Sequence, residues 1–579
     1  MKSLLATFLV LPLLAQNQKP QAAPSADSAK LSPVEGIPVT SQLVISKCGG
    51  CHTKDEKGNM LRLSYERATP EAWEEAIKRM VRLRGVTLTP DEARGVLKYL
   101  STDHGLAPEE AKPVMYYAEK RIQDETNIPN DDVKGACANC HAMARPLSWR
   151  RTALDWKYLA NLHIALYPQA DEAFRLGLNA GEGGGGRRPD ADSNKPTPLE
   201  TALAYLSKAA PLETPEWAEW RARMRAPKLA GRWVVSARIT GHGKFYGEMI
   251  VEPKPGTDDE FTTRVKLTSL KDGSTLTHTG RSVVYAGYAW RGRSKGTLAA
   301  NAAPDDLASE MREVMWVSPD QSMAEGRWFW GEYQEFGFDV KMQRASADPM
   351  LITVDKSALK TGTSANKVKL VAESLPAQIS LDDLDFGSGV KVRKIISHSA
   401  TEIIAEVDVA ADAVSGKRDI AFRRSVLPSA IAVYDHLDYI KVTPESTLAR
   451  LGSERHPKGF QQFEAVGYQR GADGKMHTAD DVELGPLDDV KWTIEEFYSV
   501  YGDDDKEFVG SLSSTGFFTP ASDGPNPQRK FSRNNYGDIW VVATSKDEKD
   551  KEGKPLAGKS YLVVTVPAYI RWDQPEVGQ

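Results

Sequence analysis

The 579-residue sequence contains only four cysteines, no histidine-rich tract and no long apolar segment after its N-terminal leader. The small number of cysteines excludes a disulfide-rich scaffold. Because no internal segment is long and apolar enough to cross a bilayer, no membrane span is predicted. The formal net charge of −5 at pH 7 gives no reason to expect nucleic acid or an anionic membrane as a partner. With 41% hydrophobic and 26% charged residues, the chain has the composition of an ordinary globular protein.

All four cysteines lie in two C-x-x-C-H segments, residues 48–52 and 137–141. Two thiols three positions apart can each form a thioether with a haem vinyl group, and the adjacent histidine can bind the iron. A single C-x-x-C is also typical of half a zinc site or of a redox dithiol, but neither needs the following histidine twice. The sequence therefore predicts two covalently bound haems c, with thioethers at Cys48, Cys51, Cys137 and Cys140 and proximal ligands His52 and His141.

The region around the two motifs is an internal repeat, and the repeat predicts the remaining iron ligands. Seven positions separate Trp73 from Met80, and seven also separate Trp156 from His163. Both tryptophans fall within helical patterns, so about two helical turns separate each from a residue that can bind iron. We predict that Met80 is the second axial ligand of the first haem and that His163 is that of the second. A thioether ligand would give the first haem the higher reduction potential.

Each of these two assignments has an alternative. Met80 could pack in the core, because methionine often fills gaps there, and His163 could be a buried, hydrogen-bonded histidine. Met143 is a weak competitor because it follows the second motif by only two residues, too close to reach the opposite face of the haem. The residues that compete for the two ligand positions are Met60, Met115, Met143 and His104.

The N-terminal leader has a positive residue, Lys2, followed by a mostly apolar run from Leu4 to Leu14. This run is too short to span a bilayer, so residues 1–23 are predicted to be a cleaved secretory signal rather than an anchor or a buried helix. Export agrees with the attachment of c-type haem outside the cytoplasm. A glycine-rich segment at 181–197 lengthens the second repeat and predicts a loop.

The predicted fold is multidomain, with a mainly α dihaem cytochrome c domain followed by three all-β domains. The boundaries that we predict are 24–213 for the dihaem domain, 214–345 for a barrel-like antiparallel domain, and 346–428 and 429–579 for two Ig-like β-sandwiches.

Within these β domains, alternating apolar residues predict strands at 231–239, 245–251, 282–290 and 326–340, and a strand at 431–434 opens the last domain. Acidic runs at 480–481 and 503–505 lack the spacing of a calcium loop and predict solvated turns.

Three further segments carry a resemblance to a known family. They are Val283–Gly292, with the sequence VVYAGYAWRG, Gly326–Phe329, with the sequence GRWF, and Gly524–Asp538, which begins GPNP and ends NNYGD. With the two haem motifs, the chain resembles the alpha subunit of quinohemoprotein amine dehydrogenase. The glycine-rich insertion at 181–197 is longer than this resemblance leads us to expect.

The resemblance implies a periplasmic heterotrimer whose other members are a β-propeller subunit and a small subunit carrying cysteine tryptophylquinone. Primary amines would be oxidised at that quinone to aldehyde and ammonia. This chain would then pass the electrons through its two haems to an external cytochrome c or cupredoxin. No catalytic residue is predicted on this chain itself.

Two other functions remain open from the sequence alone. The chain could be a stand-alone secreted dihaem cytochrome that acts as an electron carrier, with the β domains binding a redox or cell-wall partner. It could also be a peroxidase-like enzyme, which would need an iron with an open or displaceable sixth position.

Overall fold

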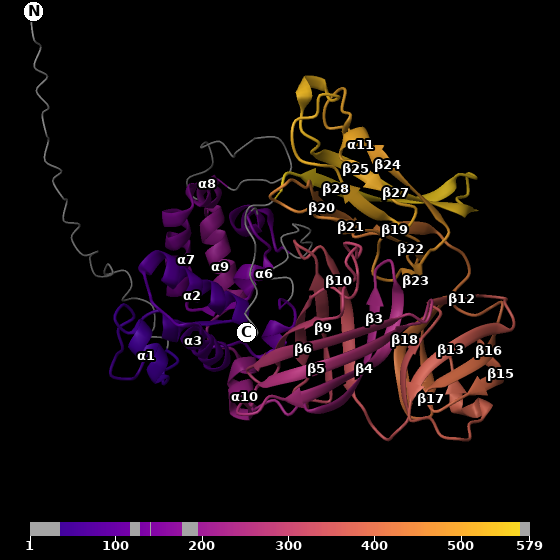
Figure 1. Cartoon of the computed structure of the whole chain (residues 1–579), viewed down its shortest axis with the longest axis horizontal. Helices are drawn as coiled ribbons and strands as arrows, with labels where there is room; N and C mark the ends of the chain where they lie inside the picture. The colour runs from indigo at the N-terminus through magenta and orange to yellow at the C-terminus, as the bar shows by residue number, and fades with distance from the viewer. Residues whose placement is uncertain (1–34, 116–127, 139, 177–194, 568–579) are drawn as a thin grey trace, which may run out of the picture.

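The computed structural model describes residues 35–115, 128–138, 140–176 and 195–567 (Figure 1). A helical unit comes first and is followed along the chain by a β-barrel and two further β units. The predicted signal peptide at 1–23 and most of the glycine-rich insertion lie outside the described residues. Among the described residues, no helix combines the length and apolar character needed to cross a bilayer.

The helical unit is built from short helices, many of which begin with a threonine cap followed by proline. This pair is favourable because the threonine hydroxyl accepts a free backbone N–H and proline needs no N–H at the first helical position. The helices are α1 (Gln42–Cys48), α2 (Pro70–Arg84), α3 (Pro90–Asp103), α4 (Pro108–Ala111), α5 (Asp131–Val133), α6 (Ala144–Leu147), α7 (Ala153–Leu166), α8 (Pro168–Leu176), α9 (Pro198–Ala209) and α10 (Pro215–Arg223). Because α10 packs against α4, the helical unit continues past the predicted boundary at 213.

Two short strands, β1 (Glu66–Ala68) and β2 (Trp149–Arg151), join the two halves of the helical unit. They pair antiparallel, with Arg67 opposite Arg150 at the centre. In the predicted repeat Arg67 and Arg150 are also equivalent positions, since each lies two residues before a threonine cap. The two halves are therefore related by a local two-fold axis at this pair.

The repeated tryptophans make the same contact in both halves. Trp73 donates its indole N–H to the carbonyl oxygen of His104 at 2.9 Å, and Trp156 donates to that of Ala210 at 3.2 Å. Both indoles are buried, and the two carbonyls belong to the C-terminal caps of α3 and α9. Each tryptophan thus fixes the last helix of its own half against the helix on which a predicted iron ligand lies.

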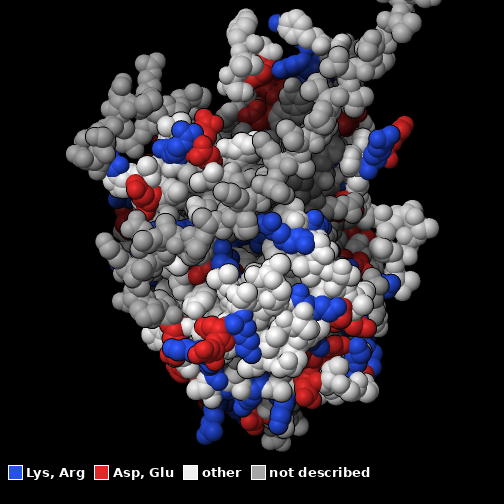
Figure 2. Space-filling model, turned by 90° about the vertical axis from the view of Figure 1, so that its left-hand side faces the viewer, with Lys and Arg blue, Asp and Glu red and all other residues white. Residues whose placement is uncertain are grey.

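The face that the helical unit presents in Figure 2 carries charges of both signs. Among the described residues on this face, lysine and arginine side chains are interspersed with aspartate and glutamate. Because the signs are mixed, the described residues of this face do not produce a strong field of one sign that would steer a charged partner over a long range.

The second unit is a closed barrel of eight strands, which confirms the predicted barrel. Around the barrel the strands are β10 (Phe336–Arg344), β3 (Gly231–Ile239), β4 (Gly243–Pro253), β5 (Glu260–Ser269), β6 (Thr275–Tyr285), β7 (Ala289–Lys295), β8 (Met311–Val317) and β9 (Met323–Trp330). Every neighbouring pair is antiparallel.

Two of the predicted barrel strands are wrong, because each spans a hairpin. The segment 282–290 contains the end of β6, a turn and the start of β7, and 326–340 contains parts of β9 and β10. The turns contain Gly287 and Gly331, with φ values of +77° and +98°. Since glycine adopts these values without strain, the chain reverses at both positions instead of continuing as one strand.

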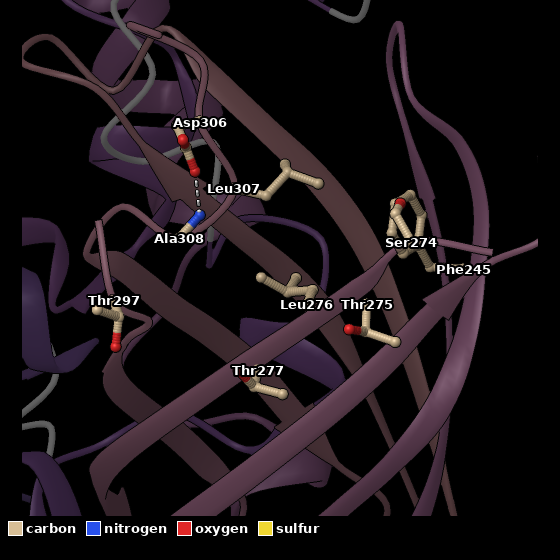
Figure 3. A pocket seen from close by; sticks show the side chains of 9 residues that line it. All are labelled: Phe245, Ser274, Thr275, Leu276, Thr277, Thr297, Asp306, Leu307 and Ala308. Atoms are coloured by element: carbon tan, nitrogen blue, oxygen red, sulfur yellow. Dashed lines mark hydrogen bonds between the residues drawn. The ribbon is translucent and has the colours of Figure 1, made fainter. Parts of the chain in front are cut away.

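A cavity of about 210 Å³ lies where the start of β6 meets the end of the β7–β8 loop (Figure 3). It is small compared with common ligand sites, which start at roughly 300 Å³. Its lining residues are Phe245, Ser274, Thr275, Leu276, Thr277, Thr297, Asp306, Leu307 and Ala308. Since none of them is cysteine, histidine or methionine, this cavity offers no ligand for haem iron.

The barrel is joined to the helical unit by buried polar contacts. Arg291 on β7 pairs with Glu71 on α2, and both side chains are less than a tenth exposed. Tyr288 donates its hydroxyl to the carbonyl oxygen of Leu106 at 3.0 Å. Arg291 and Tyr288 both belong to the segment Val283–Gly292, one of the segments that carry the family resemblance. This segment forms the hairpin that contacts the helical unit.

The third unit consists of two four-stranded sheets. One contains β11 (Met350–Val354), β13 (Asn366–Glu373), β16 (Glu402–Val409) and β15 (Val390–His398), and the other contains β12 (Ala358–Lys360), β18 (Ser425–Tyr434), β17 (Gly416–Phe422) and β14 (Leu384–Asp385). The predicted boundary between residues 428 and 429 falls inside β18. Since β18 pairs with β17 and β12, residues 431–434 belong to this unit and not to the last one.

The fourth unit contains three small sheets and a short helix, α11 (Asp505–Phe508). The strands are β19 (Tyr439–Thr443), β22 (Glu464–Gln469) and β23 (Val482–Pro486); β20 (Ser446–Arg450), β28 (Pro555–Thr565), β27 (Gly537–Lys549) and β24 (Val490–Glu496); and β21 (Gln461–Gln462), β26 (Phe517–Pro520) and β25 (Gly510–Leu512).

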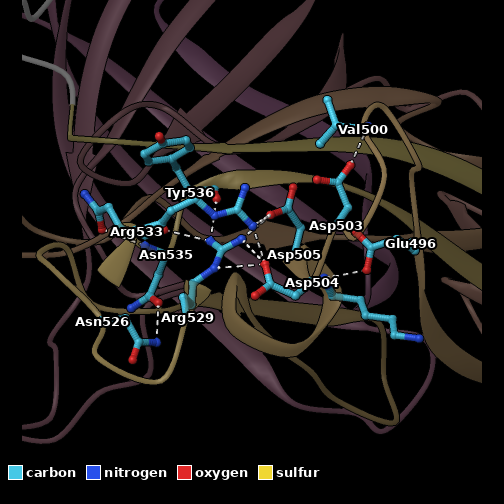
Figure 4. A network of polar contacts seen from close by, with 12 residues as sticks. Glu496, Val500, Asp503, Asp504, Asp505, Asn526, Arg529, Arg533, Asn535 and Tyr536 are labelled. Carbon is cyan, nitrogen blue, oxygen red and sulfur yellow. Dashed lines mark hydrogen bonds and ion pairs between the residues drawn. The ribbon is translucent and has the colours of Figure 1, made fainter. Parts of the chain in front are cut away.

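The prediction of a solvated turn at 503–505 is wrong for two of its three residues (Figure 4). Asp504 and Asp505 both accept from Arg529, whose side chain is almost fully buried, and Arg533 also pairs with Asp504. Arg529 further donates to the carbonyl oxygen of Tyr536 at 2.9 Å. The acidic run therefore anchors the loop at 524–538, one of the segments that carry the family resemblance.

Candidate haem sites

The first C-x-x-C-H segment begins at the C-terminal end of α1. Cys48 is the last residue of this helix, and its carbonyl oxygen accepts the backbone N–H of His52 at 2.9 Å. The Nδ1 atom of His52 lies 2.8 Å from the carbonyl oxygen of Leu61. Since a carbonyl can only accept, Nδ1 carries the proton and Nε2 keeps a free lone pair. This is the arrangement found in metal-bound histidines.

No disulfide joins the cysteines of either motif, and one thiol of each motif has a raised pKa. Burial, and to a lesser extent the charge of Cys51, raise the pKa of Cys48. Burial also raises the pKa of Cys137 to about 12. Redox-active C-x-x-C motifs show the opposite shift, because their chemistry depends on a stabilised thiolate. Cys51 and Cys140 are exposed, so one thiol of each motif is accessible.

In the second half, the structure brings His141 and His163 together. Their ring centroids lie 6.5 Å apart, with an angle of 56° between the ring planes. A metal–imidazole nitrogen distance of about 2 Å places each ring centre roughly 3 Å from a bound metal. Two imidazoles on opposite sides of one iron would therefore have centroids about 6 Å apart, close to the observed separation.

The hydrogen bonds of both imidazoles also suit this role. Nδ1 of His141 lies 3.1 Å from the carbonyl oxygen of Ala142, and Nδ1 of His163 lies 2.9 Å from that of Leu159. Each Nε2 is thereby left as the unprotonated nitrogen. Burial lowers the pKa of His141 to about 4 and also lowers that of His163. At neutral pH both rings are uncharged, which is the form that binds a metal.

The predicted ligand Met80 differs from the competing methionines in its surroundings. Met60, Met115 and Met143 are buried and belong to the main hydrophobic core. Met80 lies near the end of α2, is half-buried and is not part of that core. The three competing methionines therefore serve as core packing residues. Because Met80 lies outside that core, the alternative that it only fills a gap in the core has less support.

The competing histidine, His104, is enclosed by protein. It caps α3, has no exposed surface, and lies against the rings of Trp73 and Tyr99 with centroid distances of 6.5 and 5.8 Å. Burial lowers its pKa to about 4. The equivalent position in the second half is Ala210, which has no ligand atom. His104 therefore belongs to the packed interior of the first half.

Large apolar side chains are exposed next to the predicted ligands in both halves. Leu83, close to Met80, is 54% exposed, and Tyr167, one turn after His163, is 56% exposed. Exposed apolar side chains beside a candidate site offer surface for an apolar ligand. The residues of this kind are Leu61, Val81, Leu83, Ile164, Leu166 and Tyr167.

The site also contains residues that sequence reasoning missed. Phe174 lies against His163 with a centroid distance of 6.1 Å. The positive charges of Arg79 and Arg145 act on His163. Nothing in the local sequence distinguishes these two arginines from the other basic residues nearby. Phe174 lies in a segment with helical periodicity, and this periodicity was the signal that could have found it. In the described part of the chain, no cluster of three or more histidine, cysteine or acidic side chains is arranged to hold a metal ion.

Two of the solved structures that are similar to part of the chain are a designed barrel and a cadherin fragment. A de novo designed fluorescence-activating β-barrel is 20% identical, with 20% of this chain and 93% of the design covered and a TM-score of 0.15. Human protocadherin-24 EC1-2 is 13% identical, with 39% and 98% covered and a TM-score of 0.14. These values are too low to support an inference about function. A search of curated proteins found no match.

Models of protein families give a clear result. Residues 39–175 match the haem-binding domain of "Quinohemoprotein amine dehydrogenase A, alpha subunit". Domains II, III and IV of the quinohemoprotein amine dehydrogenase alpha subunit match residues 226–345, 348–435 and 440–577, respectively. Since the four matches occur in domain order and extend from residue 39 to residue 577, the chain belongs to the quinohemoprotein amine dehydrogenase alpha-subunit family.

Proposed function

We propose that this chain is the electron-transfer subunit of a periplasmic amine dehydrogenase and carries two covalently attached haems c. The observation that carries the proposal is the facing pair His141 and His163, with both Nδ1 atoms hydrogen-bonded to carbonyls and a separation suited to one iron. The match of residues 39–175 to a haem-binding domain supports the same function.

In this proposal each residue of the two motifs has a defined role. The four cysteine thiols would hold the haems in place, and His52 and His141 would each provide Nε2 to an iron. Met80 and His163 would be the remaining protein ligands. Each haem supplies one-electron redox chemistry when bound. The protein fixes the tautomer of the imidazoles through Leu61, Ala142 and Leu159 and excludes water with the apolar surroundings.

A protein ligand on both sides of each iron favours electron transfer over peroxidase chemistry. A peroxidase needs a position where a small molecule can reach the iron. His163 is held by its bond to Leu159 and by contact with Phe174. Since displacing it would break these contacts, the second haem is suited to exchanging electrons rather than ligands.

The proposed partners follow from the family. Its name implies a multi-subunit enzyme, and we assign amine oxidation to a small subunit with cysteine tryptophylquinone, held in a heterotrimer with a β-propeller subunit. The chain would deliver electrons to an external cytochrome c or cupredoxin. We further propose that residues 1–23 direct export to the periplasm and that the third and fourth units are Ig-like sandwiches.

The test of this function combines haem counting with copurification. Acid-denatured, solvent-washed protein is expected to retain two haems per chain, and the native protein is expected to copurify with a quinone-bearing small chain. Fewer than two retained haems would contradict the covalent assignment. Two haems on an isolated monomer would contradict the amine dehydrogenase assignment and favour a stand-alone cytochrome.

Replacing His163 by alanine is expected to open a sixth coordination position on the second haem. The reduced variant should then bind about one carbon monoxide per chain, whereas the wild-type protein should bind little. The measurement is a carbon monoxide titration followed by absorbance. His398→Ala, which removes an exposed histidine of the third unit, serves as the control and should behave like the wild type. No added binding in His163→Ala would reject His163 as a ligand.

Replacing Met80 by alanine is expected to lower the reduction potential of the first haem and leave the second unchanged. The physical reason is that a thioether ligand stabilises ferrous iron relative to ferric iron. A spectroelectrochemical titration resolves the two haems. Met476→Ala provides the control, because Met476 is an exposed methionine of the fourth unit. Two unchanged midpoints in Met80→Ala would show that another group binds the first iron.

A further inference from the structure

Helix α2 belongs to the first half of the helical unit and also contacts α6 of the second half. It carries Met80, the predicted ligand of the first haem, near its C-terminal end. On the preceding turns, Glu75 lies 3.8 Å from Arg145 of α6, which follows the second motif directly. One face of α2 is thus directed toward the second half of the unit, although the helix belongs to the first half.

Arg79, the residue before Met80, lies on the side of α2 that contacts the second half. It follows Glu75 by four positions, so both residues share one face of the helix, and Glu75 is directed to Arg145 beside the second motif. Consecutive helical residues point about 100° apart, so Arg79 and Met80 face different directions. Arg79 is therefore directed toward the second half, while Met80, the predicted ligand of the first haem, lies on a different side of α2.

The guanidinium of Arg79 lacks a partner on one side. Its Nε atom is buried from solvent and forms no hydrogen bond with any described residue. A buried charged donor without an acceptor destabilises the folded protein. Glu75, the acidic residue one turn earlier, is instead directed to Arg145. Arg79 therefore needs an acceptor that the described protein does not provide.

We propose that Arg79 binds a propionate carboxylate of the haem held by His141 and His163. This inference rests on the proposed function. A haem carries two propionates at one edge, and the planar guanidinium of arginine matches a carboxylate with two parallel hydrogen bonds. The buried Nε is one of the donors such a pair would use. Arg79 is a positioning residue in this role, since it acts on the orientation and charge of the haem and not on its iron.

The charge of Arg79 has a second effect on the same haem. A fixed cation disfavours the ferric state, which carries one more positive charge than the ferrous state. Arg79 thereby makes the second haem easier to reduce. Because α2 holds Arg79 and Met80 next to each other, a displacement of this helix would change the environment of both haems together.

The experiment is a redox titration of the purified holoprotein carrying Arg79→Gln. Electron paramagnetic resonance separates an iron with two histidines from one with histidine and methionine. In the variant, the reduction equilibrium of the bis-histidine haem is expected to shift about tenfold toward the oxidised form, while that of the other haem shifts less. Arg82→Gln is the matched control, because Arg82 lies on the same helix but is exposed, and it should cause no resolvable shift.

The outcomes separate this inference from the proposed function. Both haems attached with unchanged midpoints in Arg79→Gln would overturn the role of Arg79 and leave the electron-transfer assignment intact. A wild-type protein without covalent haem, or without a bis-histidine signal, would overturn the proposed function instead. If Arg79→Gln does not fold, Arg79→Lys provides the test. It keeps the charge but loses the paired hydrogen bonds, so we expect a shift of about threefold in the same direction, and no shift would overturn the inference.

Discussion

Replacing Glu110 by glutamine is expected to lower the free energy of unfolding of the helical unit by about 3–5 kcal/mol. Glu110 accepts from Arg67 at 2.8 and 3.0 Å and from Arg150 at 3.0 Å, and all three side chains are buried. Arg67 and Arg150 lie opposite each other at the local two-fold axis. Without the carboxylate, two buried like charges would face each other uncompensated.

The stabilisation by Glu110 depends on pH, and its direction follows from the pKa of this carboxyl group. Burial raises the pKa of Glu110, but the hydrogen bonds and charges of Arg67 and Arg150 outweigh it and hold the pKa below its ordinary value of 4.5. The stabilisation is therefore present above about pH 4.5 and is lost as the pH falls through the lower, folded-state pKa. The variant should lack this acid-side loss.

The measurement is denaturant unfolding of the holoprotein, followed by haem absorbance at pH 7 and at pH 4. Glu109→Gln is a close control, because Glu109 is the preceding residue of α4 but is exposed and lies 3.6 Å from Arg223. It should change the unfolding free energy by less than about 1 kcal/mol. Equal stabilities of the Glu109 and Glu110 variants would show that the buried network does not stabilise the unit.

The second large effect concerns the barrel interior. Burial raises the pKa of Glu313 to about 7. One carboxyl oxygen accepts from the indole N–H of Trp290 at 2.9 Å, and the other forms no hydrogen bond with any described residue. No lysine or arginine pairs with this carboxyl in the described part of the chain. We expect Glu313→Gln to remove a pH-dependent loss of stability worth about 3 kcal/mol.

The sign follows from the raised pKa. Below about pH 4.5, the ordinary value for glutamate, Glu313 is protonated in both the folded and the unfolded chain. Between pH 4.5 and 7 the unfolded chain loses the proton while the folded chain keeps it, so the wild-type barrel becomes less stable as the pH rises. Above pH 7 the difference between wild type and Glu313→Gln should stay constant.

Amide hydrogen exchange of peptides from β7 and β8, measured at pH 5 and pH 8, tests this expectation. Glu310→Gln is the control, since Glu310 lies just before β8 with about half of its side chain exposed and pairs with Arg293 at the surface. A wild-type barrel whose protection is the same at both pH values would contradict the buried, protonated state of Glu313.

Features with a short sequence signature could be predicted. The two haem motifs are contiguous, and the offset from Trp73 to Met80 and from Trp156 to His163 is visible because both pairs lie within single helices. The barrel could also be predicted, because its strands alternate. The turn at Gly287 was missed because apolar residues continue on both sides of it, and the turn at Gly331 was missed although the polar residues Glu332, Gln334 and Glu335 follow it.

Features that depend on distant partners could not be predicted. Asp504 and Asp505 are acidic residues in a row, and only folding brings Arg529 to them. The end of the third unit was misplaced because the assignment of β18 depends on its pairing with β17 and β12, which no local pattern encodes. Arg79 has the same local sequence features as its basic neighbours and is distinguished only by its position near His163.

The contacts of Arg291 with Glu71 and of Tyr288 with Leu106 have a mechanical consequence. They connect α2 and the segment after α3 directly to the barrel wall, so the barrel and these helices move as one rigid unit. A protein bound to the outside of the barrel would therefore also be fixed in position relative to the helical unit. Its distance from the candidate haem sites would then depend on residues far from those sites.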